Sequence, residues 1–143
     1  MLPEEYSAVD LILGKQRSVT IGRGVAGYAF KTFSPELQDV RRRYMAGDGA
    51  LFVSGSYVVT DLWTGGEATG EDRAFAEEVL HYTYDGGRAA QRGRVRVVTS
   101  HPGFSRDEYR YVNEYRPDRY RVESPDALRP AGAGAFSVMR YVE

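Results

Sequence analysis

Residues 34–53 read SPELQDVRRRYMAGDGALFV and carry the signals of a helix that leads directly into a buried strand. Ser34 is a favourable N-cap, and Pro35 suits the first helical position because that position needs no amide hydrogen. Four apolar side chains then recur on one stripe of the helix, which Gly47 ends: Leu37, Val40, Tyr44 and Met45. The apolar run at 50–53 predicts a strand that continues, or bulges, as far as residue 59.

A second apolar run, VDLIL at residues 9–13, lies upstream of this helix. Neither run shows the alternation of a half-exposed strand, so we expect two strands buried on both faces, as parallel strands are. A strand, a helix and a strand in this order form a βαβ unit. We therefore expect 9–13 and 50–53 to be neighbours in one sheet, with the 34–46 helix lying across it.

The pattern changes in the second half of the chain. A second helix is predicted from Thr69, which has capping-box spacing to Asp72 and precedes an apolar face of Phe75, Ala76, Val79 and Leu80. Residues 94–99 alternate arginine and valine, which predicts a strand with one arginine-bearing face near a sheet edge. Three further elements are expected: a strand at 109–115, a one-turn helix at 124–130 and a last strand at 135–142.

These elements predict an α/β fold with an open, partly parallel sheet flanked by helices and with antiparallel strands in the C-terminal half. With 143 residues the chain suits a single domain, 1–143. It has no cysteine, which excludes disulfides and thiolate nucleophiles, and no apolar run approaches the roughly 20 residues of a membrane span. The net charge of −1 argues against a nucleic-acid partner, although residues 88–121 carry nine arginines and four acids.

The block at 34–57, in which a helix precedes Gly47-Asp48-Gly49 and the string ALFVSGSY, resembles class I glutamine-amidotransferase-like domains. The resemblance implies a flavodoxin-like arrangement of strands and helices. It does not imply amidotransferase chemistry, because those enzymes use a cysteine nucleophile and this chain has none.

Four further strings resemble bacterial surface proteins named xanthan-lyase-like: VSGSY at 53–57, FAEEVL at 75–80, VESPDA at 122–127 and RY at 140–141. Genuine polysaccharide lyases of that name are built from a helical toroid and β-sandwiches, which this α/β pattern does not match. The resemblance therefore implies a location outside the cell or in its envelope rather than a lyase reaction. It also implies that the chain is part of a larger exported multidomain protein with polysaccharide or adjacent domains as partners.

The segment after the 50–53 strand is the first candidate site, because α/β proteins place ligands at the ends of their strands. A hydrolase interpretation makes Ser54 or Ser56 the nucleophile, His81 or His101 the base and Asp61 the residue that orients the base. Candidate ligand contacts in the same segment are Tyr57 and Trp63. The alternative is a structural bulge, because Ser-Gly-Ser is not the Gly-x-Ser-x-Gly elbow of serine hydrolases.

Two other patterns carry no cofactor or metal expectation. Residues 22–27, GRGVAG, match the dinucleotide fingerprint literally, but the next helix begins only at Ser34, so its amides could not hold a pyrophosphate. His81, at the end of the second helix, and His101, in a turn, lack acidic partners at metal-ligand spacing. We expect neither a cofactor nor a metal site.

A tyrosine row in the 109–115 strand is the second candidate site. Alternation along the strand would place four side chains on one face: Tyr109, Tyr111, Asn113 and Tyr115. Arg110 would lie on the other face. The tyrosines could stack on sugar rings while arginines hold carboxylates. In a lyase acting on uronates, a tyrosine or His101 would take the proton and Asn113 or an arginine would neutralise the carboxylate. The alternative is a half-buried strand with packed tyrosines and solvated arginines.

The sequence thus leads to a first hypothesis of a non-catalytic or vestigial domain that contacts glycan or a neighbouring domain. The competing hypothesis is an enzyme domain, a lyase or hydrolase, acting on polysaccharide or cell-wall material. A third is a structural module that buries these surfaces against the rest of its parent protein; a large exposed apolar patch would favour it.

Overall fold

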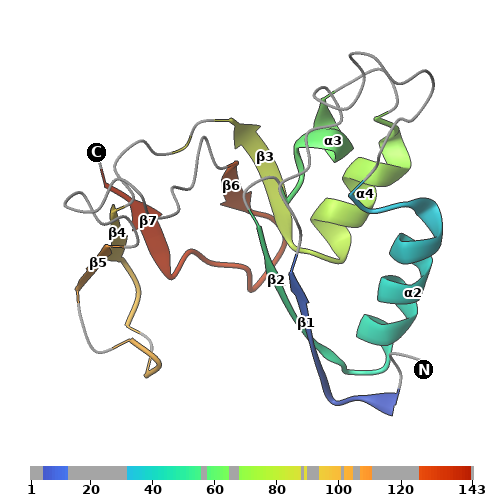
Figure 1. Cartoon of the computed structure of the whole chain (residues 1–143), viewed down its shortest axis with the longest axis horizontal. Coiled ribbons are helices and arrows are strands. Elements are labelled where there is room, and N and C mark those ends of the chain that lie inside the picture. The colour runs from blue at the N-terminus through green and yellow to red at the C-terminus, as the bar shows by residue number, and fades with distance from the viewer. Residues whose placement is uncertain are drawn as a thin grey trace, which may run out of the picture.

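The computed structural model describes residues 5–12, 32–55, 58–64, 68–87, 89, 94–100, 102–104, 107–110 and 126–142. Along the chain the elements are β1 (Ala8–Ile12), α2 (Pro35–Ala46), β2 (Ala50–Ser54), α3 (Thr60–Trp63), α4 (Gly70–Glu78), β3 (Tyr82–Gly86), β4 (Arg94–Val97), β5 (Glu108–Arg110), β6 (Ala127–Pro130) and β7 (Met139–Tyr141). The described strands form three small sheets, β1–β2, β3–β6 and β5–β4–β7, rather than one open sheet. The fold is therefore mixed α/β, with the helices at one end and the β5–β4–β7 sheet at the other (Figure 1).

The expected βαβ unit is present. Strands β1 and β2 pair in parallel, with Val9 opposite Leu51 and Leu11 opposite Val53. The connecting chain includes α2, which runs beside the pair in Figure 1. Leu11 and Val53 pack against the hydrophobic core, so the inner face of the strand pair contributes to the core, as the sequence predicts.

The prediction that both strands are buried on both faces is wrong. Ile12 is 76% exposed and Phe52 is 64% exposed. Side chains alternate across a strand, and the register puts Ile12 and Phe52 on the face opposite Leu11 and Val53. That outer face is left open by the described residues, because the core lies on one side of a sheet of only two strands.

Helix α2 begins and ends where the sequence predicts. The Ser34 hydroxyl accepts a hydrogen bond from the amide of Leu37 at 3.4 Å, Pro35 occupies the first position and Gly47 follows the last. The buried face, however, is formed by Gln38, Arg41 and Tyr44, while the other members of the predicted apolar stripe are half-buried. The helix therefore packs through polar side chains as well as apolar ones.

Gln38 explains this polar face. Its Nε2 donates to the carbonyl of Phe33 at 3.0 Å and to Oδ1 of Asp72 at 2.7 Å, which joins α2 to α4. Asp72 is also the partner of Thr69 in the predicted capping box of α4, where each side chain bonds the other residue's amide. One buried carboxylate thus begins one helix and holds another against it.

The chain after α2 turns closely around the ring of Tyr44. This side chain is buried, and its hydroxyl donates to the carbonyl of Ala50 at 3.0 Å. A Cβ placed on Gly49 would lie 2.4–2.6 Å from the ring carbons of Tyr44. Only glycine therefore fits beneath the ring.

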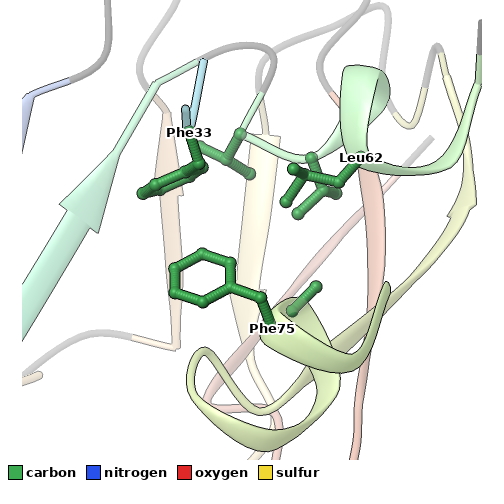
Figure 2. Packing of buried hydrophobic residues seen from close by; sticks show 6 residues of the cluster. Phe33, Leu62 and Phe75 are labelled. Carbon is green, nitrogen blue, oxygen red and sulfur yellow. The ribbon is translucent and has the colours of Figure 1, made fainter. Parts of the chain in front are cut away.

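The hydrophobic core lies between α3, α4 and the segment before α2. Figure 2 shows its buried members, which are Phe33, Val58, Val59, Leu62, Phe75 and Ala76. The rings of Phe33 and Phe75 are tilted at 54° with centroids 5.2 Å apart, a favourable aromatic arrangement. Val58 and Val59 enter this core in a bend before α3, so the prediction of a strand through residue 59 is wrong.

The second half is antiparallel, as predicted, but two of its details are different. Strand β4 lies between β5 and β7, so the prediction of a sheet-edge position is wrong; its exposed character comes from Arg96 on an uncovered face. Residues 127–130 form strand β6 instead of completing a one-turn helix. The Asp126 carboxylate accepts hydrogen bonds from the amides at the start of α3. No helix in the described part of the chain is long and apolar enough to cross a membrane.

Candidate functional site

The expected site after β2 is partly described. Ser54 ends β2 and is half-buried, whereas Ser56 and Tyr57 lie outside the described residues. Trp63 packs partly buried against the hydrophobic core, so its ring is engaged in packing. Asp61 stands on α3, where its Oδ2 accepts a hydrogen bond from the backbone amide of Thr32 at 2.5 Å.

A second carboxylate, Asp126, reaches the same helix from 66 residues away in sequence. Its Oδ2 accepts from the backbone amides of Val59 and Thr60, both at 3.0 Å. Its Oδ1 accepts a short hydrogen bond from the Thr60 hydroxyl. Because Val59 itself makes no side-chain cap, Asp126 performs the capping role at the N-terminus of α3.

The region around these two carboxylates holds unusually many unpaired polar atoms. We define the Asp61–Asp126 cluster as Thr32, Thr60, Asp61, Tyr82 and Asp126. Three of its buried atoms have no hydrogen-bond partner among the described residues: the Thr32 hydroxyl, Oδ1 of Asp61 and the Tyr82 hydroxyl. A buried polar atom without a partner is costly, and such atoms are uncommon in folded proteins.

The electrostatics of the cluster disfavour negative charge. Burial raises the pKa of Asp126, and the nearby charge of Asp61 raises it further against the hydrogen bonds from Thr60 and Val59. Burial, with the charge of Asp126, also raises the pKa of Tyr82. A carboxyl group that keeps its proton more readily is suited to act as a general acid.

The proposed catalytic triad is not assembled by the residues that the structure describes. His81 is exposed, has a positive φ of 57° and uses its carbonyl to accept from the amide of Ala131. No hydrogen bond joins His81 to Ser54 or Asp61 within the described ranges. Ser56 and His101 lie outside them.

No group of three or more histidine, aspartate or glutamate side chains suited to a metal occurs in the described segments. The Asp61–Asp126 cluster offers only two carboxylates, and both oxygens of Asp126 already accept hydrogen bonds from α3.

The second expected site, the tyrosine row, is represented by Tyr109 alone. Tyr109 lies opposite Val95 in the β4–β5 ladder, and its ring meets that of Phe104 edge-on at 5.9 Å between centroids. Tyr111, Asn113 and Tyr115 fall outside the described residues, and the register places Arg110 opposite Arg94.

The β5–β4–β7 sheet has two chemically different faces. Val95 and Val97 lie opposite Tyr141 and Met139, which gives one apolar face. Arg94 and Arg96 alternate with these valines and therefore lie on the other face, where Arg140 stands directly opposite Arg96. Arg94 pairs with Glu108 at 2.6 Å. The predicted arginine-bearing face is thus confirmed, and Tyr109 lies on the face opposite to it.

A groove of about 880 Å³, which no sequence pattern predicted, opens between β6 and β7. Its walls include Val95, Leu128, Arg129, Met139 and Arg140. Asp126, the cap of α3, also borders this groove. Its formation depends on the pairing of β6 with β3 and of β7 with β4, which joins segments far apart in the sequence and has no local sequence signal.

Neither a family model, nor a curated protein, nor a solved structure matches this chain.

Proposed function

We propose that this chain is a non-catalytic or vestigial α/β domain that acts as a binding module, contacting glycan or a neighbouring domain of an exported multidomain bacterial protein. Its extracellular or envelope location, and its place in a longer protein as one domain spanning 1–143, are parts of this proposal that rest on the resemblance to surface proteins. The parallel β1–β2 pair with α2 is compatible with the finer assignment to a glutamine-amidotransferase-like, flavodoxin-like arrangement.

One observation carries the proposal. The polar side chains beyond the end of β2 hold backbone in place: Asp126 uses both carboxylate oxygens on the start of α3, and Asp61 binds the amide of Thr32. Carboxylates that accept hydrogen bonds from backbone amides in this way stabilise the fold and do not point to a catalytic role. The open groove between β6 and β7 and the uncovered outer face of β1–β2 remain as surfaces suited to contact.

The proposal is tested by incubating the purified chain with xanthan, polygalacturonate and peptidoglycan. Unsaturated uronate ends, followed by ultraviolet absorbance, report lyase action, and new reducing ends or released muropeptides report hydrolysis. We expect no product above a boiled control. Affinity electrophoresis in gels that contain the same polysaccharides shows whether the chain binds them without cleaving them. Sustained product formation by homogeneous protein would overturn the non-catalytic proposal.

The raised pKa of Asp126 beside Asp61 favours one alternative, an enzyme acting on polysaccharide or cell-wall material with Asp126 as general acid. The alternative requires that Asp126→Asn abolish turnover while circular dichroism shows an intact fold. It also requires that the pH profile of kcat in the unaltered protein show a basic limb, where the general acid loses its proton. Turnover that persists in Asp126→Asn removes Asp126 from any such mechanism.

A further inference from the structure

The outward-facing backbone of Met139 in β7 is the first of three observations that point to a partner; no described residue hydrogen-bonds to it. The amide of Val98 donates to the carbonyl of Val138, and the amide of Val142 donates to the carbonyl of Arg94. Residues 138, 140 and 142 therefore turn their backbone groups toward β4. Because an antiparallel ladder alternates, the amide and carbonyl of Met139 face away from β4. They lie along the groove, which Met139 lines.

Strand β6 presents the second edge. The amide of Ala131 donates to the carbonyl of His81, and Thr83 lies opposite Arg129 in the same ladder. By the same alternation the backbone of Leu128 faces away from β3. Pro130 occupies the next outward position, where a residue without an amide hydrogen costs no ladder bond.

These two edges border one groove, which residues of both strands line. Its volume of about 880 Å³ is sufficient for a few residues of extended chain, since ligand pockets span roughly 300–1,000 Å³. Unpaired strand edges are ready templates for another strand. An extended polypeptide is the ligand whose own backbone supplies the matching donors and acceptors.

The third observation is the charge beside the groove. Arg96 and Arg140 stand directly opposite each other, and both are exposed. Arg96 has Glu108 opposite it on β5, whereas Arg140 forms no ion pair with any described residue. Like charges in directly opposite positions destabilise a sheet. A strand added along β7 would place one side chain beside Arg140, and a carboxylate there would offset the repulsion. The residues before and after this acidic residue in the added strand would lie on the apolar face with Val95 and Met139.

We infer that the groove between β6 and β7 binds an extended peptide segment of alternating apolar and acidic residues, which pairs as a strand with the outward-facing backbone of Met139 in β7. This inference rests on the proposed function and names its partner as protein, such as a segment of an adjacent domain. Main-chain hydrogen bonds to Met139 supply affinity, and Arg140 supplies selectivity for a carboxylate.

The probe is the synthetic peptide acetyl-Val-Glu-Val-Glu-Val-amide, titrated into the ¹⁵N-labelled chain. We expect saturable shifts of the Met139 and Leu128 amide resonances. Two matched peptides separate the contributions: one has lysine in place of glutamate, and the other is N-methylated at its central residues so that its backbone cannot donate. Both should bind at least about tenfold more weakly.

Two protein variants complete the test. Arg140→Glu should weaken the glutamate peptide by about three- to tenfold and improve binding of the lysine peptide, while Arg73→Glu, on the exposed face of α4, should change neither. Met139→Pro removes an amide that does not bond β4 and should abolish the shift of the Leu128 amide resonance. If Met139→Pro fails to fold, the N-methylated peptide decides the same point.

Failure of the inference is distinct from failure of the proposed function. Absence of shifts with the glutamate peptide, or equal binding of its N-methylated form, overturns strand addition. Binding of polygalacturonate that depends on Arg140 and leaves the Met139 amide unmoved also overturns it, in favour of a glycan ligand for the same module. Product formation in the polysaccharide assays contradicts the non-catalytic function, whatever the peptide does.

Discussion

The helical half and the β5–β4–β7 sheet differ in how they are held together. All buried hydrophobic side chains among the described residues lie between Phe33 and Ala76. The described positions of the β5–β4–β7 sheet include no fully buried side chain, and its strands are joined by ladder hydrogen bonds. A region with its own core is stable by itself, whereas a thin sheet with open faces depends more on what it contacts. The comparison separates the part of the molecule that maintains the fold from the part available for recognition.

The largest expected effect is in the helical core. Phe75→Ala removes a fully buried ring that packs on Phe33, so we expect unfolding free energy to fall by about 3–5 kcal/mol. The smaller truncation Val97→Ala in β4, at a half-buried position, should cost only about 1 kcal/mol. Urea titrations monitored by circular dichroism measure both. Equal losses would mean that the β5–β4–β7 sheet has a core of comparable strength.

The next effect concerns the link that joins the two halves of the sequence. Asp126→Ala leaves the amides of Val59 and Thr60 without their acceptor, so we expect a loss of about 2–3 kcal/mol. Asp126→Asn keeps one carbonyl oxygen and should lose less. Hydrogen exchange at the start of α3 should accelerate most in the alanine variant; unchanged exchange there would argue against Asp126 as the cap.

The pH dependence of stability provides a further test of the same carboxyl group. Because the pKa of Asp126 is raised in the folded state, the folded protein binds this proton more readily than the unfolded chain does. Its contribution to stability is therefore greatest at low pH and is lost as pH rises from the unfolded pKa through the folded one. We expect the stability of wild type relative to Asp126→Asn to fall across that window in paired thermal melts. A rise would show that hydrogen bonding outweighs burial at this site.

A smaller effect is expected at the beginning of α4. Thr69→Ala removes the hydroxyl that accepts from the Asp72 amide and should cost about 1 kcal/mol. Thr69→Ser retains the capping box and should stay close to wild type. Chemical denaturation of the two variants side by side checks the difference, and an equally large loss in Thr69→Ser would shift the explanation from hydrogen bonding to methyl packing.

The smallest effect is expected in the β5–β4–β7 sheet. Glu108→Gln weakens the ion pair with Arg94 and should lower the free energy of unfolding by less than about 1 kcal/mol. The side chains of Arg94 and Glu108 are 27% and 28% exposed. The difference from wild type should shrink in high salt, because screening weakens the pair. A loss comparable with that of Asp126→Ala would indicate that electrostatics, and not the backbone ladder, holds this sheet.

Local signals predicted local structure well in this chain. The Ser34 cap, Pro35 and the Thr69–Asp72 capping box act between residues three or four apart, and the structure has both helices starting there. The parallel pairing of β1 with β2 was also predictable, because a βαβ unit leaves few alternatives.

What the sequence could not reveal depends on contacts between distant residues. Gln38 is buried because it meets Asp72, and Asp126 caps α3 from far away, so neither burial nor role follows from neighbouring residues. The central position of β4 likewise depends on β7 returning beside it. At the candidate site, Asp61 was identified, but Thr32, Tyr82 and the groove between β6 and β7 were not, because they are brought together only by folding.

The close approach of Gly49 to the ring of Tyr44 has a consequence for finding relatives of this chain. A glycine five positions after a buried tyrosine is a geometric requirement, so this pair should persist in homologous sequences even where surface residues have diverged. A homologue with a larger residue at the glycine position should have a smaller one in place of the tyrosine. Such paired replacement offers a marker by which remote members of this lineage can be recognised.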